Sequence, residues 1–486
     1  MATTNNTTDK SLRQPLPSLT GGAGGGSVLG GSFIVIGITD HPQPWFPPEV
    51  MEIISQGRIF SGGKRHHEIM SSLLPSDHVW IDISVPLEDV FSRYQALLET
   101  GGAGEGPTVI IFASGDPLFY GFAVTLQRRF PDVGIRVFPS FNSLQMLAHR
   151  LLLPYHDMRI VSLTGRPWQE FDRALIEQAT KIGILTDREH TPSAIARRML
   201  EYGYTHYQMH VGEHLGNPQT ERVATLTLEE AATSTFAMPN CVILEGNSSL
   251  PTREGGGRVF GERVRTFGLP DSSFALLDGR AKMITKMPIR LLTLQALDLT
   301  HRHTLWDIGA CTGSVSIEAR LLFPHLHVVA FEIRPECEAI IRENARRHGA
   351  PGIEVRMGDF LAPSLPPRGG ANISSGMPAE TQVPPRGDLE GAFAPPRGGR
   401  EGAPDAIFIG GHGGRLKEIM AKGLQYLAPD GVIVMNSVVA PKVTTDSHRL
   451  WDEACAELGL RQEPPMRIQL NDNHPITILK AHNRKS

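Results

Sequence analysis

The sequence is poor in cysteine, and it has neither a long apolar run nor an excess of positive charge. Its four cysteines (Cys241, Cys311, Cys337 and Cys455) are widely spaced and form no Cys-x-x-Cys pair, so we expect neither a metal site nor a disulfide framework. A reducing cytoplasm is the simplest location for such a protein. No apolar run approaches the ~18 residues of a membrane-spanning helix, which argues against a membrane protein. The net charge of -4 argues against a nucleic-acid-binding protein, which usually carries a basic stripe.

The length of 486 residues is too great for one hydrophobic core and suits two or three domains, of which we expect one at 32–247 and one at 266–482. Residues 1–31 are rich in Thr, Asn, Ser and Gly, which predicts a disordered tail. Residues 248–265 contain three consecutive glycines and indicate a linker. Residues 363–404 repeat Pro-Pro-Arg-Gly with almost no apolar periodicity, so we expect a solvated, disordered insertion.

The most informative stretch lies between residues 305 and 332. An apolar run at 305–308 is followed by a small-residue turn from Gly309 to Gly313 and then by a helical pattern, which together predict a strand, a tight loop and a helix. A second apolar run ends on Glu332, 19 residues after Gly313. In a parallel sheet the end of this second strand lies beside the first loop, where a carboxylate can accept hydrogen bonds from both hydroxyls of a ribose.

The spacing of the glycines bears on the kind of nucleotide. The dinucleotide fingerprint Gly-x-Gly-x-x-Gly places a pyrophosphate at the helix start, but Cys311 stands between the two glycines of this loop. A nucleoside without phosphates, such as S-adenosylmethionine, needs the close backbone approach and the acid but not the third glycine. Asp359 follows a third strand and could accept the adenine amino group. A nicotinamide-dependent dehydrogenase and a non-catalytic nucleotide-binding scaffold, whose Pro-Arg-Gly repeats recruit partners, remain alternatives.

The first part of the chain alternates strand and helix patterns from Ser32 onward, which implies parallel strands with helical crossovers. After the apolar run at 108–113, Gly115 can let the backbone approach a ligand, and Pro117 can open the next helix. Two aromatic residues, including Tyr120, follow and could wall a pocket. From about residue 206 the strand-like runs become shorter, which favours a second, meandering lobe.

Three segments of this part, Ala113–Gly121, Pro139–Ser143 and Ser162–Arg166, resemble the tetrapyrrole (corrin and porphyrin) methyltransferase family, and the resemblance covers 32–247. Within the family the branch that methylates C5 of precorrin-6 is the most similar. The resemblance implies two α/β lobes with S-adenosylmethionine between them. By the same resemblance, the residues that contact this cofactor are Gly37, Ser114, Gly115, Asp116, Pro117, Tyr120 and Ser143.

The second part resembles another family. The segments Phe267–Phe274, Met283–Lys286 and Asp307–Glu318 are similar to the family that methylates precorrin-6B at C15 and decarboxylates the C12 acetate. The resemblance implies a Rossmann-like methyltransferase fold. Family members commonly have glycine at the position of Cys311 and a small residue at that of His412. The implied cofactor contacts are Thr285, Gly309, Ala310, Cys311, Thr312, Gly313, Glu332, Gly358 and Asp359.

Together these features predict an α/β protein in which a two-lobed tetrapyrrole methyltransferase fold precedes a Rossmann-like domain. The resemblance implies S-adenosylmethionine-dependent methylation of precorrin-6B, or of its cobalt form, at C5 and C15 in cobalamin biosynthesis, and it implies a homo-oligomer. Loss of the C12 acetate carboxylate could require a delivered proton, for which His412 and Glu318 are the candidates. Basic residues such as Arg65, His66 and Arg290 are candidate anchors for the carboxylates of the tetrapyrrole.

Overall fold

The structure, a computed structural model, separates into two compact units, of which the first ends at Phe141 and the second begins at Asn142. The expected tail, linker and insertion lie outside the described residues, apart from residues 31, 403 and 404. The residues that the structure describes are 31–100, 106–246, 267–362, 403–438, 447–470 and 475–483.

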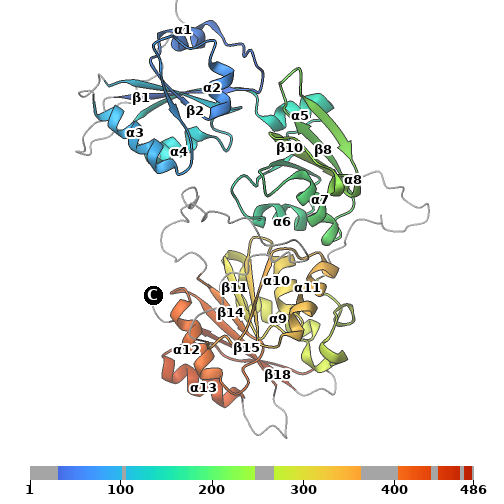
Figure 1. Cartoon of the computed structure of the whole chain (residues 1–486). Coiled ribbons are helices and arrows are strands. Elements are labelled where there is room, and N and C mark those ends of the chain that lie inside the picture. Colours follow the sequence, from blue (N-terminus) through green and yellow to red (C-terminus); the bar gives the residue numbers. More distant parts are fainter. Residues whose placement is uncertain are drawn as a thin grey trace, which may run out of the picture. The chain divides into compact units, whose positions relative to one another are not determined.

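The first unit is built on a parallel sheet in the order β3-β2-β4-β1-β5. Four helices connect these strands, so the expected alternation of strand and helix is confirmed (Figure 1). The elements are β1 Ser32–Ile38, α1 Pro48–Gln56, β2 Ile59–Gly62, α2 Lys64–Met70, β3 Val79–Asp82, α3 Leu87–Glu99, β4 Thr108–Ser114, α4 Phe122–Arg129 and β5 Gly134–Phe138.

Alternate residues of the first sheet pack against helices on opposite faces. Ile110 and Phe112 of β4 pack in a cluster with α1 and α2, whereas Val109 and Ile111 pack in a cluster with α3 and α4. A parallel sheet buried on both faces explains why these strands are continuous apolar runs. The prediction that Pro117 opens the next helix is wrong, because α4 begins only at Phe122.

The second unit begins with a mixed sheet in the order β6-β7-β10-β8-β9. Only β6 and β7 are parallel; the other neighbours in this sheet are antiparallel, which agrees with the change of strand pattern along the chain. The elements are α5 Ser143–Leu151, β6 Arg159–Ser162, α6 Gln169–Ile176, β7 Lys181–Leu185, α7 Pro192–Glu201, β8 Tyr207–Glu213, β9 Arg222–Leu226, α8 Leu228–Thr233 and β10 Asn240–Gly246.

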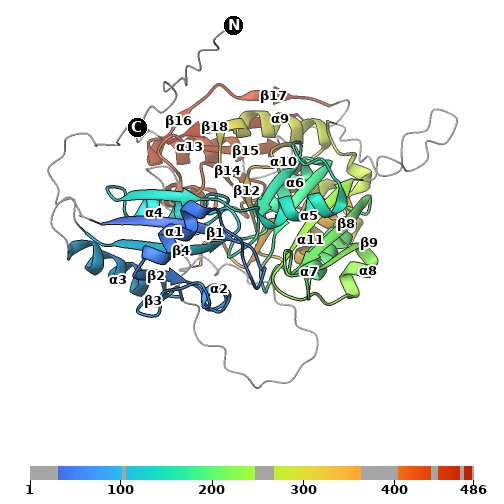
Figure 2. The ribbon, with the colours of Figure 1, turned by 90° about the horizontal axis from the view of Figure 1, so that it is seen from above.

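The rest of the second unit is a larger sheet in the order β13-β12-β11-β14-β15-β18-β16, with β17 paired to β18. The strands from β13 to β15 are parallel, and β18 joins β15 in antiparallel (Figure 2). Short 3-10 helices lie at Asp271–Ser273, Leu277–Gly279, Ala281–Met283 and Leu299–His301. The other elements are α9 Met287–Leu297, β11 Thr304–Ile308, α10 Ser314–Leu322, β12 His327–Glu332, α11 Glu336–His348, β13 Ile353–Met357, β14 Ala406–Ile409, α12 Leu416–Tyr426, β15 Val432–Val438, α13 Ser447–Leu458, β16 Arg461–Gln462, β17 Met466–Ile468 and β18 Ile476–His482.

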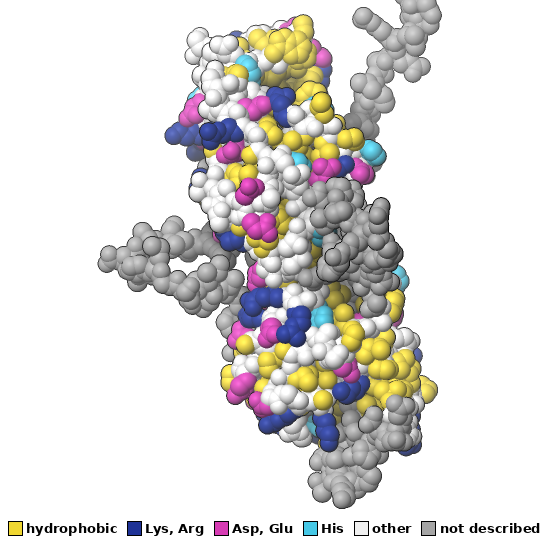
Figure 3. All heavy atoms as spheres, turned by 90° about the vertical axis from the view of Figure 1, so that its right-hand side faces the viewer, with side chains coloured by type: hydrophobic (Ala, Val, Ile, Leu, Met, Phe, Trp, Pro, Cys, Tyr) yellow, Lys and Arg dark blue, Asp and Glu magenta, His cyan; other side chains and the backbone are white. Residues whose placement is uncertain are grey.

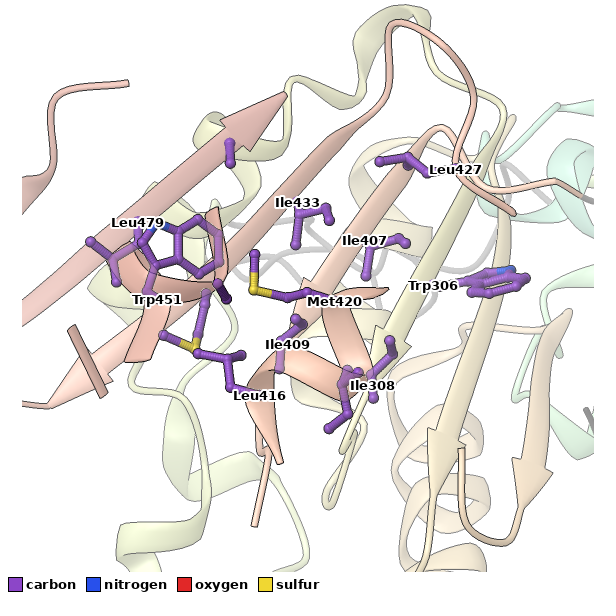
Figure 4. Packing of buried hydrophobic residues seen from close by; sticks show 14 of the residues in the cluster. Trp306, Ile308, Ile407, Ile409, Leu416, Met420, Leu427, Ile433, Trp451 and Leu479 are labelled. Carbon is purple, nitrogen blue, oxygen red and sulfur yellow. The ribbon is translucent and has the colours of Figure 1, made fainter. Parts of the chain in front are cut away.

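Both faces of the larger sheet are covered by helices. Trp306 and Ile308 of β11 belong to a core cluster with α12 and α13, and Leu305, which precedes Trp306, belongs to a cluster with α9 and α10. Trp451 of α13 is fully buried in the first of these clusters (Figure 4). This packing holds the strand ends in fixed register. Among the residues described, no helix is both long and apolar enough to cross a membrane.

We predict that Trp451→Ala lowers the free energy of unfolding of the second unit by about 3–5 kcal/mol, because a large side chain with no exposed surface leaves a cavity. Chemical denaturation of the full chain, followed by circular dichroism, measures this loss. Trp45→Ala is the matched control, because Trp45 is 83% exposed. Equal midpoints for the two variants would contradict the prediction.

Candidate active site

A cavity of about 380 Å³ lies at the carboxyl ends of β11, β12, β13 and β14. In parallel α/β sheets this edge is where ligands bind. Of the site residues predicted from the sequence, the structure brings together Gly309, Glu332, Gly358, Asp359 and His412 along the wall of this cavity.

The loop after β11 has a strained backbone. Gly309, Cys311 and Gly313 all have positive φ angles, of 78°, 50° and 71°. The left-handed conformation costs an L-residue about 1 kcal/mol, which explains why glycine suits the position of Cys311. A Cβ on Gly309 would also lie only 2.8 Å from the backbone nitrogen of Gly411. Gly309 therefore permits the close approach of the loop after β14.

The carboxylate of Glu332 accepts five hydrogen bonds. Its Oε1 accepts from the backbone N–H groups of Ile333 and Arg334 and from the Nε of Arg334. Its Oε2 accepts from the backbone N–H of Cys311 at 2.8 Å and from the Nη2 of Arg334 at 2.9 Å. Burial on its own raises the pKa of Glu332, but these hydrogen bonds hold the pKa below its usual range. Glu332 is therefore ionised at neutral pH, as an acceptor for a ribose must be.

Asp359 also has an arginine partner. The guanidinium of Arg415 donates to both carboxylate oxygens, at 3.0 and 3.2 Å, and the backbone N–H of Leu361 donates to Oδ1. The side-chain hydrogen bond from Arg415 is the main cause of the lowered pKa of Asp359. Sequence reasoning missed both Arg334 and Arg415, although Arg334 stands two residues after the predicted ribose acceptor.

His412 follows β14 and lines the same cavity as Glu332. Its Nδ1 accepts a hydrogen bond from the backbone N–H of Gly414, and its Nε2 lies 3.3 Å from the hydroxyl of Ser447. Burial lowers the pKa of His412, so the ring is neutral at pH 7. Since Nδ1 is an acceptor, the neutral ring carries its proton on Nε2.

Glu318 lies outside the cavity wall and is almost completely buried. It accepts from the Nε of Arg290 at 2.9 Å and from the backbone N–H groups of Gly268 and Leu269. Arg290 has no exposed surface, and the two side chains tie α9 to α10. We therefore do not retain Glu318 as a proton donor, and the interpretation of Arg290 as an anchor for substrate is wrong.

Five other residues predicted to contact the cofactor do not line the cavity, namely Thr285, Ala310, Cys311, Thr312 and Gly313. The carbonyl of Thr285 accepts from Arg290, and the N–H of Ala310 donates to the carbonyl of Phe331. Thr312 is buried, and its carbonyl accepts from a side chain of α11. These residues shape the loops around the cavity, and their contact with a ligand stays a prediction.

Asp307, the residue before the end of β11, is a buried carboxyl group with one unpaired oxygen. The backbone N–H and the hydroxyl of Ser316 both donate to its Oδ2, whereas its Oδ1 has no partner. Burial raises the pKa of Asp307 to about 6. This carboxyl group therefore binds a proton more tightly in the folded chain than in the unfolded chain.

In the first unit, the loops after β4 and β5 lie against Gly37 of β1. A Cβ on Gly37 would lie 2.0 Å from the carbonyl oxygen of Gly115 and 2.7 Å from the backbone nitrogen of Ser140. Asp116 closes the turn after β4 by accepting from the backbone N–H of Leu118. Glycine at position 37 is thus required by neighbouring backbone, whether or not a ligand also approaches there.

Ser114 ends β4 and accepts hydrogen bonds from two side chains. The Nη2 of Arg65 lies 2.9 Å from its hydroxyl oxygen, and the Nη1 of the same arginine pairs with Asp40. The Nε2 of His66 lies 2.9 Å away, and its Nδ1 accepts from the backbone N–H of Gly63, so Nε2 carries the proton. Burial, and next the charge of Arg65, lower the pKa of His66 to about 4. Both acceptor positions of Ser114 are thus filled, which directs its own hydrogen elsewhere.

The other cofactor contacts predicted within residues 32–247 lie partly in the first unit and partly in the second. Tyr120 has a positive φ of 54° and is 46% exposed, and the carbonyl of Pro117 accepts from the N–H of Ala123. Ser143 begins α5 in the second unit, where its side chain bonds to Cys241. The two groups of residues belong to different compact units, so their convergence on one ligand stays a prediction.

Two protein-family models match separate parts of the chain. The model described as "Tetrapyrrole (Corrin/Porphyrin) Methylases" matches residues 42–232. The model described as "Precorrin methyltransferase domain" matches residues 278–364. The second range contains β11, the glycine loop and Glu332. These matches and the α/β sheets define a methyltransferase that uses S-adenosylmethionine, and they confirm the predicted fold class.

Curated relatives identify the family. A precorrin-6Y C(5,15)-methyltransferase [decarboxylating] of Sinorhizobium sp is 30% identical over 426 residues, which cover 87% of this chain and 88% of the relative. Two proteins of Salmonella typhi each cover 43% of this chain. One is a cobalt-precorrin-6B C(15)-methyltransferase (decarboxylating), 31% identical over 94% of its length. The other is a cobalt-precorrin-7 C(5)-methyltransferase, 26% identical over 98% of its length. The chain belongs to the precorrin-6Y C(5,15)-methyltransferase family, which replaces the dehydrogenase and scaffold alternatives.

We predict that Asp307→Asn removes a pH dependence of stability between about pH 4 and pH 6. In this window the folded chain keeps the proton that the unfolded chain releases, so the stability of the native chain falls as pH rises through about 6. The variant should therefore be more stable than the native chain at pH 7, by ~1–3 kcal/mol. Thermal unfolding at a series of pH values measures this, with exposed Asp430→Asn as control. Parallel pH profiles for native chain and Asp307→Asn would contradict it.

A second prediction separates a structural from a catalytic Glu318. Because Glu318→Gln removes the buried carboxylate that pairs with Arg290 and leaves only the partly exposed Asp271 as an acidic partner, we expect a loss of about 3–5 kcal/mol in the free energy of unfolding. Glu338→Gln, which breaks an exposed pair with Arg342, should change it by less than about 1 kcal/mol. Denaturation of both variants tests this. Unchanged stability combined with slower turnover for Glu318→Gln would instead indicate catalysis.

Proposed function

We propose that this chain transfers two methyl groups to one precorrin tetrapyrrole, at C5 and at C15, and removes the carboxylate of the C12 acetate in cobalamin biosynthesis. The two family matches on separate ranges, together with relatives named for each activity, support the division of labour. The structural observation that carries the proposal is the cavity at the strand ends of the second unit, with an ionised Glu332 beside a glycine loop.

The residues around this cavity fit an adenosine. Gly358, Gly411 and Gly413 line it, and a Cβ on any of them would meet nothing within 4 Å, so the space above their backbone is open. In the proposal Glu332 accepts the ribose hydroxyls, and Asp359 accepts the adenine amino group. Exposed Ile333 offers an apolar surface for the adenine ring. The first unit would use the turn from Ser114 to Pro117 for its own cofactor.

The chain's contribution to methyl transfer is alignment. S-adenosylmethionine, when bound, supplies a methyl group on a sulfonium that electron-rich carbons attack directly. The proposed site therefore needs no activated nucleophile. Loops with fixed backbone conformations, such as that from Gly309 to Gly313, can hold the reacting groups in line, and such positioning lowers a barrier by several kcal/mol. The meso carbon gains the methyl group and releases its proton.

Decarboxylation requires an acceptor for the released electron pair and a donor of a proton. As the bond from the C12 acetate carbon to its carboxylate breaks, the electron pair enters the conjugated imines of the macrocycle, and the carbon then takes up a proton. His412 is the proposed donor, since it lines the cavity and its neutral ring carries the proton on Nε2. The relatives' names put the C15 reaction on a precorrin-6B and the C5 reaction on a precorrin-7. We therefore propose that C15 is methylated first.

The cellular setting belongs to the same proposal. We propose a homo-oligomer in the cytoplasm that binds neither membrane nor nucleic acid. The four cysteines are free and buried, as a reducing compartment permits. On the face drawn in Figure 3, lysine and arginine side chains are interspersed with acidic ones and form no continuous basic stripe.

Two substitutions test the division of labour. We expect Glu332→Ala to slow the release of carbon dioxide by about 100-fold, since the cofactor would lose its main polar anchor in the second unit. Ser114→Ala should leave carbon dioxide release intact and accumulate a product with only one added methyl group. Mass spectrometry of the tetrapyrrole, incubated with labelled S-adenosylmethionine, separates the two products. Glu338→Ala is the control. Arrest of decarboxylation by Ser114→Ala but not by Glu332→Ala would overturn the assignment.

A further inference from the structure

Glu332 accepts more hydrogen bonds than a carboxylate has acceptor positions. A carboxylate offers about four acceptor positions, and Glu332 already receives five donors. Three of these donors are backbone N–H groups at the end of β12 and in the loop after β11, and they cannot leave without unfolding the loop. The other two, Nε and Nη2, belong to the side chain of Arg334, which is 36% exposed. A ribose presents the same number of hydroxyls.

The guanidinium of Arg334 therefore occupies the place that the ribose would take. A ligand that uses both oxygens of Glu332 must displace the side chain of Arg334 and leave the backbone donors in position. Exposure of the arginine makes this exchange feasible, because the side chain can rotate toward solvent without moving β12. Glu332 itself is 1% exposed and cannot move to a new partner in the same way.

Among the described residues that line the cavity, no unengaged acid is left for the displaced guanidinium. Glu332 and Asp359 are the acidic residues among those that line it, and Asp359 is held on both oxygens by Arg415. Arginine keeps its charge at any physiological pH, so a guanidinium displaced from Glu332 is free to pair with an anion at the cavity wall. A planar, bidentate donor matches a carboxylate best. Since both acids of the cavity wall are engaged, the matching anion is one that a ligand supplies.

We propose that Arg334 anchors a side-chain carboxylate of the tetrapyrrole, and that binding of the cofactor's ribose to Glu332 releases it for this task. The inference rests on the proposed function, because that function places the ribose on Glu332. Cofactor binding then creates the anion site, and the two ligands bind in order, cofactor first. Arg334 is a positioning residue, and Glu332 exchanges one pair of donors for another.

The variant Arg334→Ala should bind S-adenosylhomocysteine more tightly and the tetrapyrrole more weakly than the native chain does. Removal of the competing guanidinium should tighten the binding of S-adenosylhomocysteine at one of two sites by ~5-fold, and loss of the anchor should raise the KM for the tetrapyrrole by ~10-fold. Calorimetric titration of the full chain measures the first effect, with the site of the first unit as an internal reference. Release of carbon dioxide, which only the C15 reaction produces, reports the second.

Matched variants separate this role from a loss of folding. Arg342→Ala removes an exposed arginine of α11, paired with Glu338, and should change neither quantity. Arg334→Lys keeps the positive charge without the bidentate geometry, so we expect a KM for the tetrapyrrole between those of the native chain and Arg334→Ala. Circular dichroism verifies that each variant is folded.

Two outcomes would overturn the exchange while the proposed function survives. Weaker binding of S-adenosylhomocysteine to Arg334→Ala would show that the carboxylate of the cofactor, not that of the tetrapyrrole, is the partner of Arg334. An unchanged KM for the tetrapyrrole would show that Arg334 anchors nothing. A native chain that neither binds S-adenosylhomocysteine nor releases carbon dioxide would overturn the proposed function and the exchange together.

Discussion

The backbone N–H of Cys311 donates a hydrogen bond of 2.8 Å to the carboxylate of Glu332, and this contact joins the loop after β11 to the end of β12. The loop needs such a tie, because its residues 309, 311 and 313 all adopt the left-handed conformation. A buried N–H without an acceptor would cost about 1–3 kcal/mol, so the acid stabilises the loop even without a ligand. The parallel pairing of Ile308 with Phe331 brings the two strand ends level, which makes the contact possible.

Much of this arrangement could be predicted from the sequence because it follows from strand adjacency. Continuous apolar runs identified the central strands, and their order in a parallel sheet placed Glu332 beside Gly309. The partners of the charged side chains could not be predicted in this way. Glu318 meets Arg290 across 28 residues of sequence, and Asp359 meets Arg415 across 56, through the packing of helices and loops whose geometry no local pattern encodes.

In the first unit, the roles of a glycine and a proline could likewise not be predicted from the local sequence pattern. The resemblance makes Gly37 a cofactor contact, and the structure adds a separate reason for glycine there, because a Cβ would clash with the backbone of Gly115, the residue after β4. Pro117 suggested a helix start, but the turn continues to Phe122 because Asp116 caps the backbone of Leu118 first. In both cases tertiary contacts, which no local pattern encodes, determine the role of the residue.

The order of strands in the larger sheet affects how the chain can fold during its synthesis. β18 lies between β15 and β16 in the sheet, although it is the last of the three in sequence. β16 therefore has no neighbour in the sheet until residues 476–482 have left the ribosome. The parallel strands from β11 to β15, by contrast, can pair as soon as they emerge. The cavity at their carboxyl ends is thus assembled from strands that are made before the sheet's last edge is closed.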